Sequence, residues 1–137
     1  MKISEVMCTD VLVIAPDDTL GRAAGVMRKH DVGSLPVGEN DRLVGFITDR
    51  DITLRGIGAG MGPEASVREV MTGKVHYCFD DETVDEVAEK MASMELRRMP
   101  VLNRDKRLVG IVSLANFAHS RDVGASQELL RGVARPH

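Results

Sequence analysis

The chain of 137 residues is long enough for one compact domain or two small intertwined subdomains, and 43% of its residues are hydrophobic, enough for a folded core. Its formal net charge of −3 argues against nucleic acid as the main partner, because phosphate backbones require a basic surface. The sequence contains no run of about 18 apolar residues, so no membrane span is predicted, and the amino-terminal stretch lacks the pattern of a signal peptide.

The first predicted elements are a helical turn, a strand and a longer helix. Residues 4–7 suit a single helical turn with Ser4 as its N-cap. The apolar run from Val11 to Ala15 predicts a strand. A helix is expected to begin around residues 17–19, because acids are favoured at helix starts. Its apolar residues follow helical spacing: Leu20, Ala23, Ala24 and Met27.

Two short strands and a second helix complete the first half of the chain. Residues 35–37 predict a strand, and the proline in it suits an edge or a strand start. Asn40 and Asp41 predict a hairpin turn that leads into a strand over residues 43–47. A helix is predicted from about Asp49 to Arg55. Residues 57–66 are rich in glycine and indicate a linker.

The same layout returns in the second half as an internal repeat. Residues 67–84 align with residues 3–20, 64 positions earlier, and one residue is inserted later in the second copy. The clearest matches pair Glu5-Val6-Met7 with Glu69-Val70-Met71, Pro36-Val37 with Pro100-Val101, and Arg42-Leu43-Val44-Gly45 with Arg107-Leu108-Val109-Gly110. The second copy therefore predicts strands at 75–79, 99–101 and 108–112, a turn at 104–106, and helices starting at 81–83 and spanning 114–120.

The predicted fold class is α/β of the α+β kind, with two pseudo-symmetric β-α-β-β-α repeats packed sheet to sheet. One unit of this size buries too little surface to be stable alone, whereas two copies share a core. The predicted division is residues 1–56 for repeat 1, 57–66 for the linker, 67–120 for repeat 2 and 121–137 for a tail. Within the tail, only residues 127–133 favour a helix.

The order of these motifs, found twice, resembles the tandem CBS domain pair, a family named after cystathionine β-synthase. The paired Glu-Val-Met segments, the LPV and MPV strands and the G-h-h-T-x-x-D pattern of GFITDRD (residues 45–51) carry the resemblance. It covers residues 3–120, and the chain looks like small stand-alone bacterial CBS proteins without a catalytic domain. The resemblance implies a Bateman module, two of which commonly associate into a disc-like homodimer.

The resemblance also implies a ligand and a role. Clefts between the repeats of such modules bind adenosine-containing molecules: AMP, ADP, ATP, S-adenosylmethionine or NAD. The expected role is to sense this ligand and to regulate a partner protein, with no catalysis and no required cofactor. Two alternatives remain: a structural or interaction module with vestigial nucleotide sites, and a metal or redox sensor that uses Cys8, His76 and Cys78.

Thr48 and Asp51 are the strongest candidate ligand residues in the first copy. The Asp51 carboxylate can accept both hydroxyl hydrogens of a ribose cis-diol, and the Thr48 hydroxyl with the free N–H groups of the helix start suits a phosphate oxygen. The alternative is a capping box, with Thr48 as N-cap and Asp51 at N3, and capping can coexist with binding. Including the wall that the resemblance implies for the base, the candidates are Val11, Val13, Ile14, Ser34, Leu35, Pro36, Thr48, Arg50 and Asp51.

The second copy departs from the first at the acid. Asn116 stands where Asp51 does, and its amide can bond a diol only without charge assistance, so this site is expected to be weaker, differently selective or empty. Tyr77 can stack on a purine, and the resemblance implies that Arg98 meets phosphates. Strand alternation favours Arg98 over its neighbour Arg97. The candidates are His76, Tyr77, Arg98, Met99, Pro100, Ser113 and Asn116.

Other chemistries find little support in the residues. His76 and Cys78, two apart on a predicted strand, are expected to share a face, but two ligands do not make a zinc site. The sequence has no C-x-x-C, no G-x-S-x-G and no Walker A motif, so no enzyme is predicted. Two cysteines do not make a disulfide framework, and we expect a cytoplasmic protein with reduced thiols.

Overall fold

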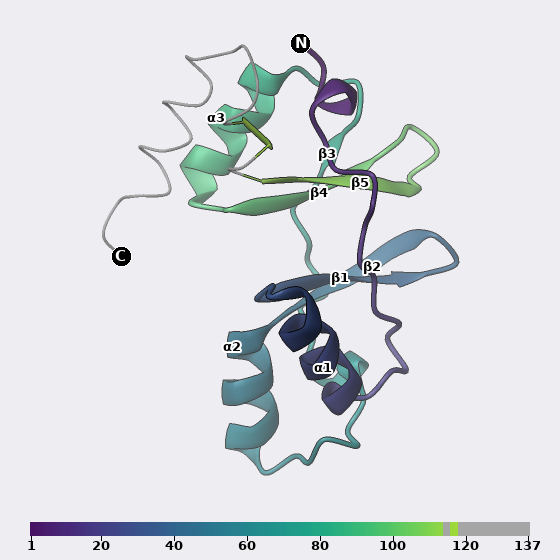
Figure 1. Ribbon diagram of the computed structural model, residues 1–137, viewed down its shortest axis with the longest axis vertical. Coiled ribbons are helices and arrows are strands. Elements are labelled where there is room, and N and C mark those ends of the chain that lie inside the picture. Colours follow the sequence, from purple (N-terminus) through teal and green to yellow (C-terminus); the bar gives the residue numbers. More distant parts are fainter. Residues whose placement is uncertain (114–115, 118–137) are drawn as a thin grey trace. The chain divides into compact units, whose positions relative to one another are not determined.

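The computed structural model describes residues 1–113 and 116–117 and divides the chain into two compact units (Figure 1). Residues 12–75 form the first-repeat unit, and residues 1–11 with residues 76–137 form the second-repeat unit. The predicted helix at 114–120, apart from Asn116 and Phe117, and the predicted tail helix at 127–133 lie outside the described residues. No helix in the described part of the chain is long and apolar enough to cross a membrane.

The first-repeat unit combines a two-stranded sheet with helices. Its elements are α1 (Leu20–His30), β1 (Ser34–Glu39), β2 (Arg42–Thr48), α2 (Asp49–Asp51), a π-helical segment (Ile52–Gly56), and 3₁₀ turns at Ile57–Ala59 and Val67–Glu69. β1 and β2 are antiparallel, and the turn between them places Asn40 and Asp41 at positive φ, 55° and 63°. Two successive positive φ angles are typical of a tight hairpin, so the predicted turn is confirmed.

The helix α1 follows the predicted pattern. Thr19 is its N-cap and accepts a hydrogen bond from the Arg22 N–H at 3.1 Å. The helix contacts β1 and the π-helical segment, so its apolar stripe faces the core. The buried core of this unit consists of Ile14, Leu20, Ala23, Met27, Leu35, Val37, Ile47, Ile52, Val67 and Val70.

In the described part of the second-repeat unit, the helix α3 covers a three-stranded sheet (Figure 1). Its elements are a 3₁₀ turn (Ile3–Glu5), β3 (Cys78–Phe79), α3 (Val84–Met94), β4 (Arg98–Leu102) and β5 (Leu108–Ser113). β4 lies in the middle, parallel to β3 and antiparallel to β5. The core joins the inner face of α3 to the sheet: Ile3, Cys78, Val84, Val87, Ala88, Met91, Met99, Val101, Val112 and Phe117.

The first strand of each repeat is much shorter than predicted. In the stretch 11–15 only Ile14 pairs with β1: its N–H donates to the Pro36 carbonyl at 3.1 Å, and its carbonyl accepts from Gly38 at 2.9 Å. The preceding bond of this parallel ladder, toward the amino-terminal end of the strand, would need an N–H on Pro36, which proline lacks. The ladder therefore begins at Ile14. Pro100 has the same position relative to Cys78, where β3 begins.

The expectation that each proline marks a sheet edge or a strand start is wrong for Pro100. This residue is the third of β4, the central strand. Pro100 faces Ile111, and both backbone groups of Ile111 bond Cys8 instead, each at 2.9 Å. Because the backbone groups of Ile111 already bond Cys8, the N–H that Pro100 lacks leaves no group of β5 without a partner.

Two predicted boundaries also shift. Ser66 is the N-cap of the turn Val67–Glu69, and the equivalent turn of the first repeat begins after Lys2 and not, as predicted, after Ser4. The helical stretch from Asp49 continues to Ala59, beyond the predicted end at Arg55. Gly56 lies close to α1 within this stretch: a Cβ at this position would lie 3.0 Å from a methyl group of Leu20, so a larger residue would require Leu20 to shift.

Each compact unit contains a short segment of the other sequence repeat. Cys8, from the start of the chain, exchanges two backbone hydrogen bonds with Ile111 of β5, both 2.9 Å long. Thr72, from the start of the second repeat, makes the equivalent pair of 2.9 Å bonds with Phe46 of β2. The compact units therefore differ from the sequence repeats at these two segments. We call them the exchanged segments: residues 7–8 in the second-repeat unit and residues 71–72 in the first-repeat unit.

The exchanged segments explain the glycine that ends both copies of Arg-Leu-Val-Gly. A Cβ on Gly45 would lie 2.6 Å from the Met71 sulfur and 3.0 Å from the Thr72 carbonyl oxygen. A Cβ on Gly110 would lie 2.6 Å from the Met7 sulfur and 3.0 Å from the Cys8 carbonyl oxygen. The repeated Glu-Val-Met and the repeated glycine are therefore two sides of one contact.

Replacing Gly45 by alanine should destabilise the protein, because the added methyl group overlaps both a side chain and backbone of the exchanged segment. We expect a loss of about 1–3 kcal/mol in the free energy of unfolding, the usual cost of overpacking. Urea denaturation measures it. Gly25→Ala is the control: a Cβ there meets nothing within 4 Å inside α1, so this variant should gain about 0.5–1 kcal/mol. Equal stability of the two variants would contradict the packing account.

Candidate functional site

Thr48 and Asp51 form the capping box that the spacing allows. The Asp51 carboxylate oxygen Oδ2 accepts from the Thr48 N–H, and the Asp51 N–H donates to Thr48 Oγ1, both at 3.0 Å. The pair closes the end of β2 and starts the helical stretch. Since the Asp51 side chain retains 20% of its exposure, the carboxylate is fixed in direction yet reaches the surface.

The second oxygen of Asp51 has a partner that sequence reasoning missed. Arg55 Nη2 lies 3.0 Å from Asp51 Oδ1, and the same nitrogen donates to Thr72 Oγ1 at 3.1 Å. The spacing of four residues on one predicted helix was the available signal for the ion pair. The contact with Thr72 had no signal, because it depends on the exchanged segment.

The strand register brings Ser34 to the same place. Ser34 of β1 lies directly opposite Thr48 of β2, so Ser34, Thr48 and Asp51 gather at one end of the hairpin. We call these three residues the first-copy cluster. Arg50 is exposed and follows Asp49 in the same helical turn.

The apolar candidates of the first copy divide between core and surface. Ile14 and Leu35 belong to the hydrophobic core, and Pro36 is buried. Val13 is 46% exposed, and Val11 belongs to the second-repeat unit. The described structure therefore does not gather the predicted wall for the base into one surface of the first-repeat unit.

The second copy repeats the cap with different chemistry. Asn116 Oδ1 accepts from the Ser113 N–H at 2.8 Å and from the Ser113 hydroxyl at 3.0 Å. A carbonyl oxygen thus serves the cap as well as a carboxylate does, which explains how the fold tolerates the change from acid to amide. Arg98 lies opposite Ser113 in the register, at the position of Ser34. We call Arg98, Ser113 and Asn116 the second-copy cluster.

The two clusters differ in charge. The first-copy cluster contains one acid and no base, and the second-copy cluster contains one arginine and no acid. Met99 and Pro100, the remaining candidates on β4, are buried, and Met99 is part of the core. The three equivalent positions therefore carry one formal negative charge in the first copy, at Asp51, and one formal positive charge in the second, at Arg98.

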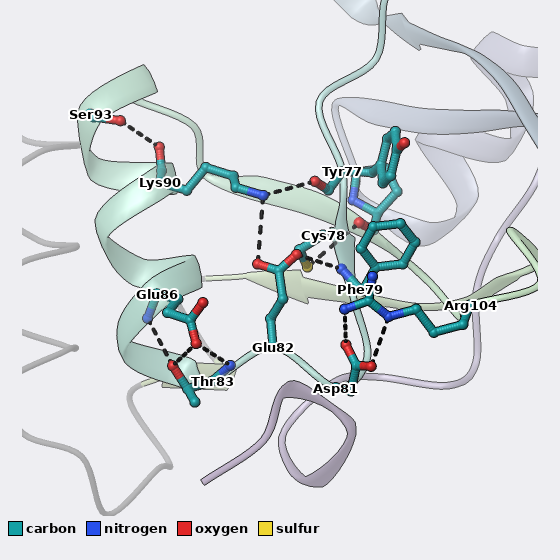
Figure 2. A network of polar contacts seen from close by, with 11 residues as sticks. Tyr77, Cys78, Phe79, Asp81, Glu82, Thr83, Glu86, Lys90, Ser93 and Arg104 are labelled. Carbon is teal, nitrogen blue, oxygen red and sulfur yellow. Dashed lines mark hydrogen bonds and ion pairs between the residues drawn. The ribbon is translucent and has the colours of Figure 1, made fainter.

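Tyr77 belongs to an aromatic and ionic group beside β3 (Figure 2). Its ring meets Phe79 edge to face, with centroids 5.6 Å apart. The guanidinium of Arg104 lies 4.1 Å from the Phe79 centroid and donates two hydrogen bonds of 2.8 Å to Asp81. These bonds hold the pKa of the Asp81 carboxyl below its ordinary value. One side of the Tyr77 ring is thus in contact with Phe79, whose own ring is held by Arg104.

Lys90 ties α3 to the same stretch (Figure 2). Its Nζ donates to the Tyr77 carbonyl at 3.2 Å and lies 3.6 Å from a Glu82 carboxylate oxygen. The first copy has Val26 at the position of Lys90, and valine offers no such donor. The backbone before β3 is therefore held by a charge that the first repeat lacks.

His76 and Cys78 do not share a face, contrary to expectation. β3 begins only at Cys78, so strand alternation does not extend to His76. His76 is exposed, whereas Cys78 is fully buried and its thiol contacts the Pro100 carbonyl at 3.8 Å. Burial raises the pKa of the Cys78 thiol to about 12. In the described ranges, no three His, Cys, Asp or Glu side chains are grouped as metal ligands.

Known proteins share both the sequence and the structure of this chain. The model of the CBS domain family matches residues 3–56 and again residues 67–121. Hypoxic response protein 1 of Mycobacterium tuberculosis is 34% identical over 134 residues, which cover 96% of this chain and 93% of that protein.

Two solved structures are similar over most of their length. The crystal structure of Hypoxic Response Protein I with two coordinated zinc ions has 36% sequence identity and a TM-score of 0.78, covering 88% of this chain and 99% of that one. The CBS domain pair of protein MJ0100, in complex with 5′-methylthioadenosine and S-adenosyl-L-methionine, has 27% identity and a TM-score of 0.73, covering 86% and 93%. Matched by the family model in both repeats and along nearly its whole length by a relative, the chain belongs to the CBS domain family as a tandem pair.

Proposed function

We propose that this CBS domain pair is a non-catalytic regulatory module that senses an adenosine-containing ligand through the first-copy cluster. The observation that carries the proposal is the Asp51 carboxylate, fixed by its capping bonds and still 20% exposed. The MJ0100 domain pair binds two ligands that share an adenosine group. AMP, ADP, ATP, S-adenosylmethionine and NAD all carry that group, and its ribose diol is the part that a carboxylate recognises.

The chemistry of recognition follows from the acceptor capacity of the carboxylate. Asp51 accepts from the 2′- and 3′-hydroxyls of the ribose, in charge-assisted bonds that are about twice as strong as neutral ones. Thr48 and Ser34 lie beside Asp51 and offer hydroxyl groups to the rest of the ligand. Because the capping box already fixes the Asp51 rotamer, little side-chain entropy is lost on binding.

The second-copy cluster is expected to bind more weakly or with another preference. Asn116 offers a neutral acceptor that already serves the Ser113 hydroxyl, whereas Arg98 supplies a positive charge beside it. The cluster therefore favours an anionic group over a sugar diol. The remaining candidates, including Arg50, His76 and Tyr77, stay predictions for ligand contact.

Regulation requires that the ligand prefer one arrangement of the protein over another. We propose that the chain acts in the cytoplasm as a homodimer, and that ligand binding alters its contact with a regulated protein. We do not propose nucleic acid as a partner, because the negative net charge of the chain would repel its phosphate backbone.

Adenosine-containing ligands should raise the melting temperature, because preferential binding stabilises the folded state by about 2.7 kcal/mol at 100 times Kd. Asp51→Asn should remove most of this shift. The substitution keeps a carbonyl oxygen for the cap, as Asn116 does in the second copy, and replaces the other carboxylate oxygen, with its charge and its contact to Arg55, by a neutral NH2 group. Thermal unfolding across the ligand series measures both effects.

Asp10→Asn removes one exposed acid elsewhere and serves as the matched control, with an unchanged ligand shift. A full ligand shift in Asp51→Asn would move the site away from Asp51. If no adenosine-containing ligand shifts the wild-type protein, the interaction module with vestigial sites becomes the better account.

One thiol per chain should react rapidly with a thiol reagent at pH 8. Cys8 is exposed, whereas Cys78 is buried and its pKa is raised to about 12. Cys8→Ser should abolish the rapid phase. Two rapid thiols in the native wild type would instead favour the redox-sensor alternative.

The raised pKa of Cys78 also predicts how stability depends on pH. Below pH 9 the thiol is neutral in both states, whereas between pH 9 and about 12 only the unfolded chain ionises it. Stability should therefore fall across this window, and the fall should be smaller in Cys78→Ala when denaturation is measured against pH.

A further inference from the structure

The carboxylate proposed to hold the ribose is already engaged at both oxygens. Oδ2 accepts from the Thr48 N–H at 3.0 Å, and Oδ1 lies 3.0 Å from Arg55 Nη2. The capping bond belongs to the fold, because it starts the helical stretch. The Arg55 contact does not: its guanidinium is a long, half-exposed side chain that reaches back from the following turn.

We propose that Arg55 is a gate on this site, a specificity-determining residue that competes with the ribose diol for Asp51. The proposal rests on the function proposed above. With its side chain only 20% exposed and Oδ2 engaged in the cap, Asp51 offers a ligand mainly Oδ1, where Arg55 Nη2 already lies 3.0 Å away. A ribose diol that bonds Oδ1 therefore displaces the guanidinium. The apparent affinity for the ligand is then reduced, because binding must first break the Asp51–Arg55 ion pair.

The gate is connected to the exchanged segment. Arg55 Nη2 also donates to Thr72 Oγ1 at 3.1 Å, and Thr72 pairs through its backbone with Phe46 of β2. Displacing the guanidinium from Asp51 therefore breaks a link between the ligand residue and a segment contributed by the second repeat. Ligand occupancy is passed to that segment through one side chain.

The gate belongs to the first copy alone. The position equivalent to Arg55 in the second copy is Ser120, and the position equivalent to Asp51 is Asn116. Neither a guanidinium nor a carboxylate is encoded there. Competition by an internal cation is thus a device of the repeat that carries the acid.

Adenosine binding measured by calorimetry at two ionic strengths tests the gate. Adenosine is uncharged, so its own contacts are nearly insensitive to salt. Arg55→Met, which keeps an unbranched apolar stem and removes the guanidinium, should bind adenosine about twofold more tightly at low ionic strength, the scale of an exposed helical ion pair. The wild-type affinity should rise when ionic strength goes from about 0.01 M to about 1 M, because the competing pair is screened. The affinity of Arg55→Met should stay constant.

Arg22→Met is the matched control. Arg22 is also an exposed arginine of the first-repeat unit, four residues after an acid, with its Nε 3.6 Å from Asp18 Oδ1. The substitution removes the same charge from the same type of ion pair. The Arg22→Met protein should therefore bind adenosine like the wild type and keep the wild-type salt dependence.

The outcomes separate the gate from the proposed function. Adenosine binding that is equal in wild type and Arg55→Met, and insensitive to salt in both, overturns the gate and leaves the function standing. Weaker binding by Arg55→Met also overturns the gate, since Arg55 would then hold the ligand. No binding of adenosine, AMP, ADP, ATP, S-adenosylmethionine or NAD by any of the three proteins overturns the proposed function and the gate with it. The wild-type salt dependence tests the gate even if Arg55→Met does not fold.

Discussion

The structure depends on one close contact, made twice: the methionine that ends each Glu-Val-Met segment packs directly against a glycine of a hairpin. Met71 and Met7 lie so close to Gly45 and Gly110 that no side chain fits between them. The same segments continue into the backbone pairs that extend β2 and β5. Because each segment comes from the other sequence repeat, neither compact unit is complete without residues from both halves of the chain. The tandem arrangement is therefore a requirement of packing.

Within these matched frames, the chemistry of the two copies diverges at equivalent positions. In both copies the backbone N–H at the end of the hairpin donates to a side-chain oxygen three residues later, and that oxygen belongs to an acid in the first copy and to an amide in the second. This tolerance lets Asp51 and Asn116 differ without cost to the fold, so the difference is available for function. In the first copy Arg55 joins Asp51 to the exchanged segment, which connects the proposed ligand residue to the contact that holds the unit together.

Much of this fold could be predicted from the sequence, because its signals are local. Thr19 and Thr83 cap α1 and α3 where the acidic helix starts indicated, and the hairpin turn at Asn40 was visible in its residues. The short first strands were missed because proline on the neighbouring strand limits the ladder, an effect between segments distant in sequence. The Arg55–Thr72 contact was out of reach for the same reason. At the candidate site, Thr48 and Asp51 were predicted as a pair, whereas the Asp51–Arg55 ion pair was missed although the spacing of four residues was a signal for it.

The central claim is that the first repeat recognises a ribose diol through one carboxylate. Calorimetric titration with adenosine and with 2′-deoxyadenosine tests this claim most directly, because the two ligands differ by a single hydroxyl group. The account predicts one adenosine site per chain and about tenfold weaker binding of the deoxy ligand, the effect of losing one hydrogen bond to a charged group. Equal affinity for the two ligands would contradict it.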